Sequence, residues 1–401
     1  MKHALILISL LMPLFLSAQT NIQWRGTDRS GIYHEQGLLT QWPESGPALK
    51  WHFDELGEGH SSVAIDADKL YLTGLKGDKG YLYVFDLNGK LLSTKEYGPE
   101  WTESYNGPRG TVTINDSKIY LTSGYGVLYC LDQNTLNLVW KKDFLSEFNA
   151  SNISWGINEA PLIVDDKVIA TPGGSKGNIV AFNKNTGELI WTCAGEGDLS
   201  AYCSPQYISD QEVPQIVTIT ANHVIGVDVK TGQKLWSIEK TNRWSVHANT
   251  PVYSKGMLLC TSGYGGGSVM LRLTDGGRHV EKVWESTELD NRLGSMVKVG
   301  NYVYGSGDKN RYWFCADWNT GEIKYKQNGY AMGNIIADEG MLYCYTDRGN
   351  MLLAKATPEK FDVVSKFPIT MGTAQHWAHP VLYKGLLLVR HGNSLMAYQV
   401  K

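Results

Sequence analysis

The chain has 401 residues and a formal net charge of −3, and hydrophobic residues make up 42% of it. This near-neutral balance excludes the global basic field on which nucleic-acid-binding proteins rely. An aromatic content of 11% and 43 glycines favour many short strands and tight turns, and no stretch with a helical period is visible.

Residues 1–18 have the pattern of a secretory signal. A short polar start is followed by an apolar run over residues 4–15 and by Ser17-Ala18. The run is too short to span a bilayer, and no later segment is apolar enough to do so. No cysteine that could carry a lipid follows the run. We therefore expect an exported protein, periplasmic or secreted, with an N-terminal segment at 19–47 and one domain at 48–401.

Units of four short strands fill the rest of the chain. The unit from Ala160 to Trp191 alternates apolar runs with the turns Asp165-Asp166-Lys167, 172–177 and Thr186-Gly187. Such a unit is typical of one blade of a β-propeller. The first hairpin of the unit recurs eight times, at 66–69, 115–118, 165–167, 209–214, 254–256, 299–301, 338–340 and 383–385. The sequence therefore predicts an all-β fold, an eight-bladed propeller.

A short phrase marks the third turn and the outer strand of the units. It reads Asp/Asn-x-x-Thr-Gly-x-x-x-Trp at 183–191 and 228–236, ends in Tyr at 317–325, and has a looser copy at 132–140. A strand that ends at Asp or Asn, followed by a Thr-Gly turn, predicts a hairpin whose outer strand carries the Trp.

The last unit predicts how the ring closes. Residues 380–399 hold only three strands, and the missing outer strand is expected from Ala48 to His52, where Trp51 takes the place of the repeated Trp. Pairing of the N-terminal strand with the last blade removes the free sheet edges that promote aggregation.

The six cysteines match neither a zinc knuckle nor a redox pair. Most of them lie inside strands, where we expect small buried hydrophobic side chains. Cys193 and Cys203 flank the crossing from the third unit to the fourth, and a disulfide between them is possible in an exported protein.

The repeated phrases resemble those of the PQQ-like, quinoprotein-type eight-bladed propellers, over about residues 24–400. The opening Trp24-Arg25-Gly26, with Trp42-Pro43 and Trp51, resembles the N-terminal part of exported bacterial members. This resemblance implies a superfamily that contains quinone-dependent dehydrogenases and non-catalytic scaffolds of outer-membrane assembly. The chain departs from the dehydrogenases because it has no adjacent cysteine pair and no Cys-x-x-Cys-His motif for haem.

Chemically capable residues gather before the inner strands, on one face of the predicted ring. The long crossings between units fall on this face, and function usually lies on long loops of a rigid scaffold. We expect His or Tyr to transfer protons there, Arg to bind an anion and Trp to stack on a sugar ring. The candidate proton-transfer residues are His60, Tyr202, His247, His376 and His379. The candidate binding residues are Tyr105, Arg109, Trp155, Asn158, Glu159, Arg243, Trp244, Asn249, Arg292 and Trp377.

Each of these residues also has a structural interpretation. A His or Asn before an inner strand can cap the strand or bond a neighbouring blade, and an indole can pack between blades. The spacing of His376 and His379 could hold a metal ion, but alternate residues of a strand face opposite ways, and we expect no metal site.

The first functional hypothesis is an exported carbohydrate-active eliminase, a dehydratase or lyase of polysaccharide degradation. It would act on uronate-containing, perhaps sulfated, oligosaccharides such as ulvan-type fragments, as a monomer. Elimination needs a cation beside the carboxylate, a base and an acid, but no redox cofactor. The alternatives are a non-catalytic scaffold or binding protein of the cell envelope and, third, a PQQ-dependent dehydrogenase. We expect no cofactor, while PQQ or a divalent metal stays open.

Overall fold

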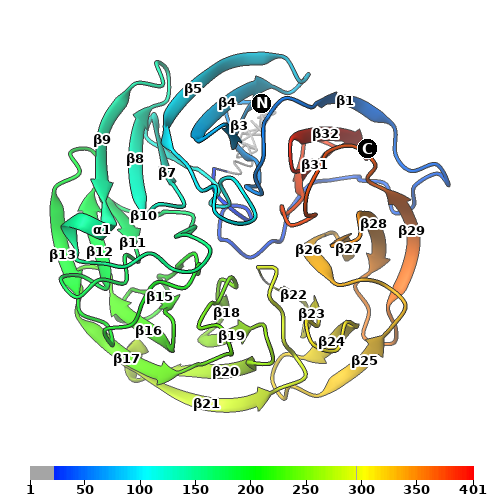
Figure 1. Ribbon diagram of the computed structural model, residues 1–401. Coiled ribbons are helices and arrows are strands. Elements are labelled where there is room, and N and C mark those ends of the chain that lie inside the picture. Colours follow the sequence, from blue (N-terminus) through cyan, green and yellow to red (C-terminus); the bar gives the residue numbers. More distant parts are fainter. Residues whose placement is uncertain (1–21, 295) are drawn as a thin grey trace, which may run out of the picture.

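A computed structural model describes residues 22–294 and 296–401, and its strands form an eight-bladed propeller of eight four-stranded antiparallel sheets (Figure 1). Blade one consists of β2 (Ala64–Asp66), β3 (Lys69–Lys76), β4 (Lys79–Asp86) and β5 (Leu91–Pro99). Blade two consists of β6 (Thr113–Asn115), β7 (Lys118–Thr122), β8 (Val127–Asp132) and β9 (Leu138–Asp143). Blade three consists of β10 (Leu162–Val164), β11 (Lys167–Ala170), β12 (Ile179–Asn183) and β13 (Leu189–Cys193). Blade four consists of β14 (Gln206–Ile208), β15 (Gln215–Ile219), β16 (His223–Asp228) and β17 (Lys234–Glu239).

The remaining blades repeat the same arrangement. Blade five consists of β18 (Val252–Ser254), β19 (Met257–Ser262), β20 (Gly267–Thr274) and β21 (His279–Ser286). Blade six consists of β22 (Val297–Val299), β23 (Tyr302–Ser306), β24 (Trp313–Asp317) and β25 (Ile323–Gln327). Blade seven consists of β26 (Gly333–Asp338), β27 (Met341–Thr346), β28 (Asn350–Lys355) and β29 (Asp362–Pro368). Blade eight consists of β30 (Val381–Tyr383), β31 (Leu386–His391), β32 (Ser394–Gln399) and β1 (Leu49–Phe53).

The predicted fold class and the predicted closure are confirmed. Strand β1 pairs antiparallel with β32, with Trp51 opposite Ala397. Figure 1 shows the two strands side by side, although they come from opposite ends of the chain. A single helical turn, α1 (Phe144–Glu147), and a 3-10 turn (Asp275–Gly277) are the only helices in the described part. None of its helices is long and apolar enough to cross a membrane.

The repeated phrase acts as a latch between neighbouring blades. In blade three, Asn183 Oδ1 accepts the backbone N–H groups of Asn185 and Thr186, which fixes the turn that leads into Gly187. The indole of Trp140, from the blade before, lies against this glycine and donates its Nε1–H to Lys184 O at 3.1 Å. Gly187 has a φ of +74°, so a side chain at this position would be strained as well as in conflict with the indole.

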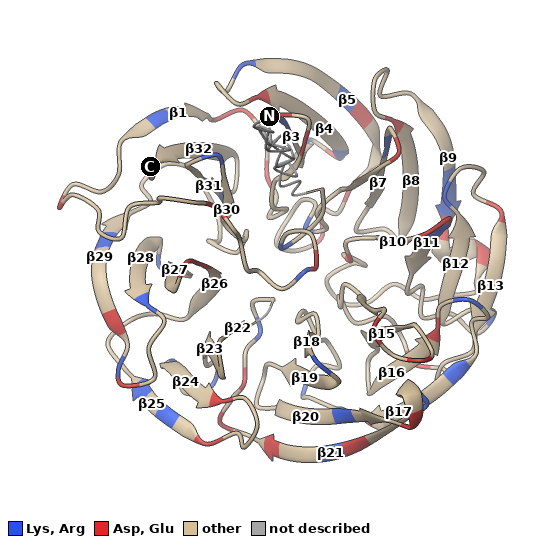
Figure 2. Ribbon diagram, turned by 180° about the vertical axis from the view of Figure 1, so that it is seen from behind, with Lys and Arg blue, Asp and Glu red and all other residues tan. Residues whose placement is uncertain are grey.

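The same latch recurs around the ring. The indoles of Trp51, Trp191 and Trp284 each lie against the turn glycine of the following blade, and each Nε1–H donates to a carbonyl of that turn. Buried apolar side chains of inner and middle strands fill the space between blades, whereas charged residues gather on outer strands and turns (Figure 2). Packing between blades therefore explains both the Gly and the Trp of the phrase.

The N-terminal segment crosses the centre of the ring, where it is drawn in dark blue in Figure 1. Its Arg25 is 1% exposed and donates to Ile335 O, to Ser30 O and to Met296 O. Arg29 is 2% exposed and donates to Ala160 O, Pro161 O and Pro205 O. The two guanidinium groups thus bind blades on different sides of the channel.

All six cysteines are buried and free. Cys193 packs in the apolar cluster between blades three and four, and Cys203 packs in the next cluster, between blades four and five. The disulfide that the sequence allowed is therefore not formed, and both thiols serve as small apolar side chains.

Candidate binding cavity at the mouth of the channel

A cavity of ≈ 340 Å³ opens at the mouth of the central channel. Its walls come mainly from the crossings that lead into the inner strands, and the turn between β19 and β20 adds Tyr264. Ten of the candidate residues line it: His60, Tyr105, Arg109, Trp155, Asn158, Tyr202, Trp244, Arg292, Trp377 and His379. The long crossings thus converge on one cavity, because every inner strand starts at the channel.

The N-terminal segment supplies one wall of this cavity. Trp24 is among the lining residues and meets the ring of His379 edge to face, with 5.2 Å between ring centroids. His379 Nδ1 lies 3.2 Å from the Arg25 guanidinium, and its Nε2 lies 2.9 Å from Leu293 O. Since Arg25 and Arg29 bind the channel wall behind Trp24, the segment separates the cavity from the rest of the channel.

The histidines that line the cavity are neutral at physiological pH. Burial, together with the charges of Arg109 and Arg390, lowers the pKa of His60 to about 3. Burial and the neighbouring Arg25 lower the pKa of His379 to about 3. Imidazoles with such low pKa values are weak bases, and neither is protonated for use as an acid near pH 7.

Three tyrosines of the cavity wall adopt a left-handed backbone conformation. The φ angles are 47° for Tyr105, 70° for Tyr202 and 59° for Tyr264. A bulky residue in this region is strained by roughly 1–2 kcal/mol. Burial raises the pKa of Tyr202 above its usual value, which keeps the phenol protonated.

Two cations face the cavity. Arg109 is held by backbone carbonyls, because its guanidinium donates to Ser104 O at 3.0 Å, to Tyr105 O at 2.9 Å and to Trp155 O. Arg292 Nε lies 3.0 Å from Asp308 Oδ1, and its guanidinium lies 5.9 Å from the Tyr264 ring centroid. Within residues 22–294 and 296–401, no Asp or Glu side chain lines the cavity. The formal charge of its lining is therefore positive.

The lining also holds hydrogen-bond donors that the protein does not use. Ser62, Thr111 and Ser204 each accept a backbone N–H, from His379, Ser62 and Ala160 respectively, at 2.9–3.1 Å. None of the three hydroxyls donates to an acceptor in the described part of the chain. Each lies two residues before an inner strand. The candidate residues chosen from the sequence do not include these three. An alignment of the repeated units on their inner strands would have shown that a hydroxyl recurs at this position.

The cavity indoles differ from the latch indoles in the hydrogen bonding of their Nε1–H groups. Latch residues such as Trp140 and Trp191 donate Nε1–H to a backbone carbonyl. No acceptor among the described residues takes the Nε1–H of the four cavity indoles, which belong to Trp24, Trp155, Trp244 and Trp377. Trp244 is 48% exposed at the rim and meets Trp155 edge to face, at 5.9 Å between centroids. These indoles offer both flat faces and free donors.

Five candidate residues lie outside the cavity lining. His247 and His376 are held elsewhere: His247 Nε2 lies 3.2 Å from Ala221 O, and His376 stacks on His391 at 3.6 Å between centroids. Asn249 donates to the backbone carbonyl of Asn291. These three side chains therefore have the structural role that the sequence also allowed, because each contacts a neighbouring segment of the ring.

Glu159 and Arg243 also point away from the lining. Glu159 is 1% exposed, accepts Thr171 N–H at 2.7 Å, and lies near Arg29. Burial raises its pKa to about 7. Arg243 stacks over the exposed indole of Trp244, 4.9 Å from the ring centroid. It therefore lies at the rim, outside the cavity.

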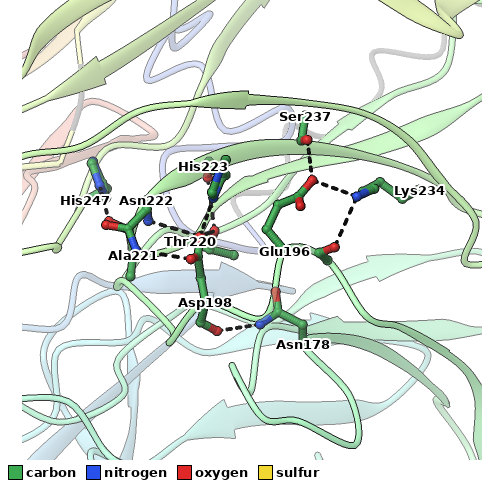
Figure 3. Close-up of polar contacts among 11 residues, drawn as sticks. Asn178, Glu196, Asp198, Thr220, Ala221, Asn222, His223, Lys234, Ser237 and His247 are labelled. Carbon is green, nitrogen blue, oxygen red and sulfur yellow. Dashed lines mark hydrogen bonds and ion pairs between the residues drawn. The ribbon is translucent and has the colours of Figure 1, made fainter.

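His247 borders a separate polar cluster (Figure 3). At its centre, Asp198 accepts hydrogen bonds from Thr220 Oγ1, from the backbone N–H and side-chain amide of Asn222, and it lies 2.8 Å from His223 Nδ1. Burial alone would raise the pKa of Asp198, but these hydrogen bonds outweigh it and lower the pKa. The cluster ties the crossing between blades three and four to the β15–β16 turn.

Parts of the chain are similar in sequence to known proteins of two kinds. The chain is 25% identical over 155 residues to a quinoprotein ethanol dehydrogenase of Pseudomonas putida, a match that covers 34% of this chain and 25% of that protein. It is 29% identical over 130 residues to the outer membrane protein assembly factor BamB of Shewanella oneidensis, covering 32% of each. The matched regions thus span a third or less of the length of these relatives.

Solved structures agree in fold. BamB from Moraxella catarrhalis superposes with a TM-score of 0.63 at 16% identity, covering 86% of this chain and 97% of that one. A europium-containing methanol dehydrogenase superposes with a TM-score of 0.68 at 15% identity, covering 94% of this chain and 90% of that one. At such identities the likeness concerns the propeller alone.

The names of these relatives raise the question of a quinone and a metal ion. The cavity indoles and Arg109 suit a flat anionic ring. A bound cation needs several oxygen ligands, usually with carboxylates among them. In the described part of the chain no carboxylate lines the cavity, and the only side-chain carbonyl oxygen there is Asn158 Oδ1. The described residues also contain no group of three or more His, Cys, Asp or Glu side chains placed to hold a metal. The residues present therefore do not fit a quinone paired with a metal ion.

A family model that matches a longer part of the chain identifies its family. The profile of the family described as outer membrane protein assembly factor BamB matches residues 78–327, which is more than half of the chain. Blades two to six lie in this range, and with them the latch indoles of Trp140, Trp191 and Trp284. The chain belongs to this family of propellers.

Proposed function

We propose that this protein is a non-catalytic binding protein of the cell envelope, with the cavity at the mouth of the channel as its ligand site. One observation carries the proposal. The cavity combines aromatic walls, arginines and unused hydrogen-bond donors, while among its described residues the pKa values of His60 and His379 are about 3 and the pKa of Tyr202 is raised. Small-molecule sites in proteins are typically about 300–1,000 Å³, and the cavity of ≈ 340 Å³ lies at the lower end of that range.

The acid–base chemistry of an eliminase has weaker support. Elimination from a uronate needs a base for the proton beside the carboxylate and an acid for the leaving group. His60 and His379 have pKa values of about 3, and the pKa of Tyr202 is raised. His247 and His376 lie outside the cavity lining. A binding role uses the same arginines and indoles without requiring a base.

The dehydrogenase alternative has support from the relatives and little from the site. One relative is named a quinoprotein, and a similar fold contains europium. The described lining of the cavity offers no carboxylate that would hold such an ion. The relatives named as assembly factors of the outer membrane support an envelope location, as does the secretory pattern of residues 1–18. That pattern lies outside the described residues.

A paired binding and turnover experiment tests the proposal. The purified protein is titrated with a panel of envelope and matrix saccharides while its tryptophan fluorescence is recorded, and each mixture is then analysed by mass spectrometry. We expect at least one ligand to change the fluorescence and to be recovered with its mass unchanged. Loss of water from an oligosaccharide, or the appearance of shorter unsaturated fragments, would establish an eliminase. Oxidation of a panel sugar or of an added alcohol, with loss of two hydrogen atoms and matching reduction of an added electron acceptor in the presence of PQQ and calcium, would establish a dehydrogenase.

A further inference from the structure

We infer that the cavity binds the terminal, carboxylate-bearing ring of an acidic saccharide, an inference that rests on the proposed binding function. It names the class of ligand and the part of the ligand that enters. Three observations lead to it: the sign of the charge in the cavity, the unused donors of its wall, and the closure of the channel behind it.

The charge selects an anion. Arg109 and Arg292 line the cavity, and within the described residues no carboxylate does. Asp308 lies 3.0 Å from Arg292 Nε and offsets that cation, whereas none of the ion pairs among the described residues involves Arg109. The Arg109 guanidinium is bound only to neutral carbonyls in the described part of the chain, so no ion pair there offsets its positive charge. In a site of low dielectric, a ligand carboxylate would be attracted strongly to this charge.

The unused donors select a ligand rich in oxygen. The hydroxyls of Ser62, Thr111 and Ser204 accept backbone N–H groups and have their own protons left to donate. The Nε1–H groups of the cavity indoles also have no acceptor in the described part of the chain. Ring, carboxylate and hydroxyl oxygens of a uronate can accept these donors, while a purely apolar ligand would leave them unpaired at a cost.

The aromatic walls suit the flat, weakly polar faces of a sugar ring. On one side lie Trp155 and Trp244, 5.9 Å apart. Another group joins three crossings, since the ring of Trp377 lies 5.0 Å from those of both His60 and Tyr105. Because His60 is 7% exposed and its ring meets that of Trp377, this part of the wall is shaped before any ligand arrives, which lowers the entropy that binding costs.

The closed channel selects the end of a saccharide chain. Trp24 lines the cavity, and Arg25 and Arg29 bind the channel wall on different sides behind it. A polymer therefore cannot thread through the ring. A terminal ring can enter the cavity of ≈ 340 Å³, while the rest of the chain stays outside near Trp244 and Arg243.

Calorimetric titration with defined sugars tests the inference. The probes are glucuronic acid, its methyl ester, glucose, and a tetrasaccharide with glucuronate at its non-reducing end or capped there by glucose. We expect glucuronic acid and the glucuronate-ended tetrasaccharide to bind, and the ester, glucose and the capped chain to bind at least about tenfold more weakly, because each lacks the terminal anion. Equal affinity for both tetrasaccharides would overturn the terminal mode, and tighter binding of PQQ than of any saccharide would overturn the ligand class.

Variants localise the binding. Trp244→Ala removes an exposed indole at the rim without touching the core, and we expect affinity for glucuronic acid to fall about tenfold. Arg109→Gln should abolish the preference for the acid over the ester, with circular dichroism as the check on folding. Leu189→Ala, at an equally exposed apolar residue on β13, is the matched control and should leave affinity unchanged. Unchanged affinity in Trp244→Ala would overturn the assignment to this cavity.

The outcomes separate this inference from the proposed function. Binding of a neutral ligand that is recovered unchanged would overturn the acidic-saccharide assignment and leave the binding function standing. Binding of glucuronate-ended chains with conversion to an unsaturated product would overturn the non-catalytic function and leave the acidic-saccharide assignment standing.

Discussion

Replacement of Arg29 by alanine tests the role of the N-terminal segment as a tie across the channel. Arg29 donates to Ala160 O at 3.2 Å, to Pro161 O at 2.6 Å and to Pro205 O at 2.9 Å, which connects blades three and four to the segment. The Pro161 carbonyl keeps a second donor, Thr113 Oγ1, at 2.6 Å. The variant therefore leaves two carbonyls, those of Ala160 and Pro205, without the donor that they have in the native structure.

The expected magnitude follows from these two carbonyls. A buried acceptor without a partner costs about 1–3 kcal/mol, so the variant should lose roughly 2–6 kcal/mol of unfolding free energy. The nearby Glu159 would also lose a favourable charge, which places the loss above the lower limit. Arg29→Lys should lie in between, because one ammonium group cannot reproduce the planar fork of a guanidinium.

The assay is equilibrium unfolding in guanidinium chloride, followed by tryptophan fluorescence and circular dichroism. The matched control is Arg243→Ala, which removes an arginine that stacks on an exposed indole and should change stability by less than about 0.5 kcal/mol. If Arg29→Ala unfolds at the same denaturant concentration as this control, the segment does not stabilise the ring, and the reasoning from its hydrogen bonds is refuted.

Three further variants probe burial, packing and closure. Burial raises the pKa of both Glu159 and Asp338 to about 7, so the folded state binds protons more tightly than the unfolded one, and stability falls as pH rises from about 4 to 7. Glu159→Gln should remove only the Glu159 share of this fall and be up to roughly 3 kcal/mol more stable than wild type at pH 8, measured by urea unfolding at several pH values. Gly232→Ala should cost about 2–3 kcal/mol in the same assay, because φ is +75° and the new Cβ would lie 2.7 Å from the Trp191 indole. Trp51→Ala removes the latch to Leu87 O at 2.8 Å and should speed hydrogen exchange in β1 and β32 more than in other outer strands.

Each of these has its own control. An unchanged pH profile in Glu159→Gln would show that Glu159 does not contribute to the fall, which Asp338 would then carry. Gly197→Ala, at a φ of +78° with no atom near the new Cβ, isolates the backbone strain, so an equal loss in both glycine variants would contradict the role of the indole contact. Uniform exchange around the ring in Trp51→Ala would contradict closure by that latch.

The sequence by itself determined the fold. The four strands of each blade and their turns follow from local patterns: alternation of apolar residues, Asp or Asn before Thr-Gly, and a Trp in the outer strand. These features depend on backbone hydrogen bonding and side-chain packing between adjacent segments, so a single unit already contains the information. The closing strand was predictable for the same reason, because Trp51 stands where the repeat requires a Trp.

Only the tertiary structure decided which residues share the cavity. His60 and His247 both precede inner strands, yet His60 lines the cavity and His247 contacts the Ala221 carbonyl. Asn158 and Glu159 are adjacent, yet only Asn158 lines it. The direction of these side chains depends on crossings from other blades and on the N-terminal segment that carries Trp24. These parts are far apart in sequence and meet only when the ring closes.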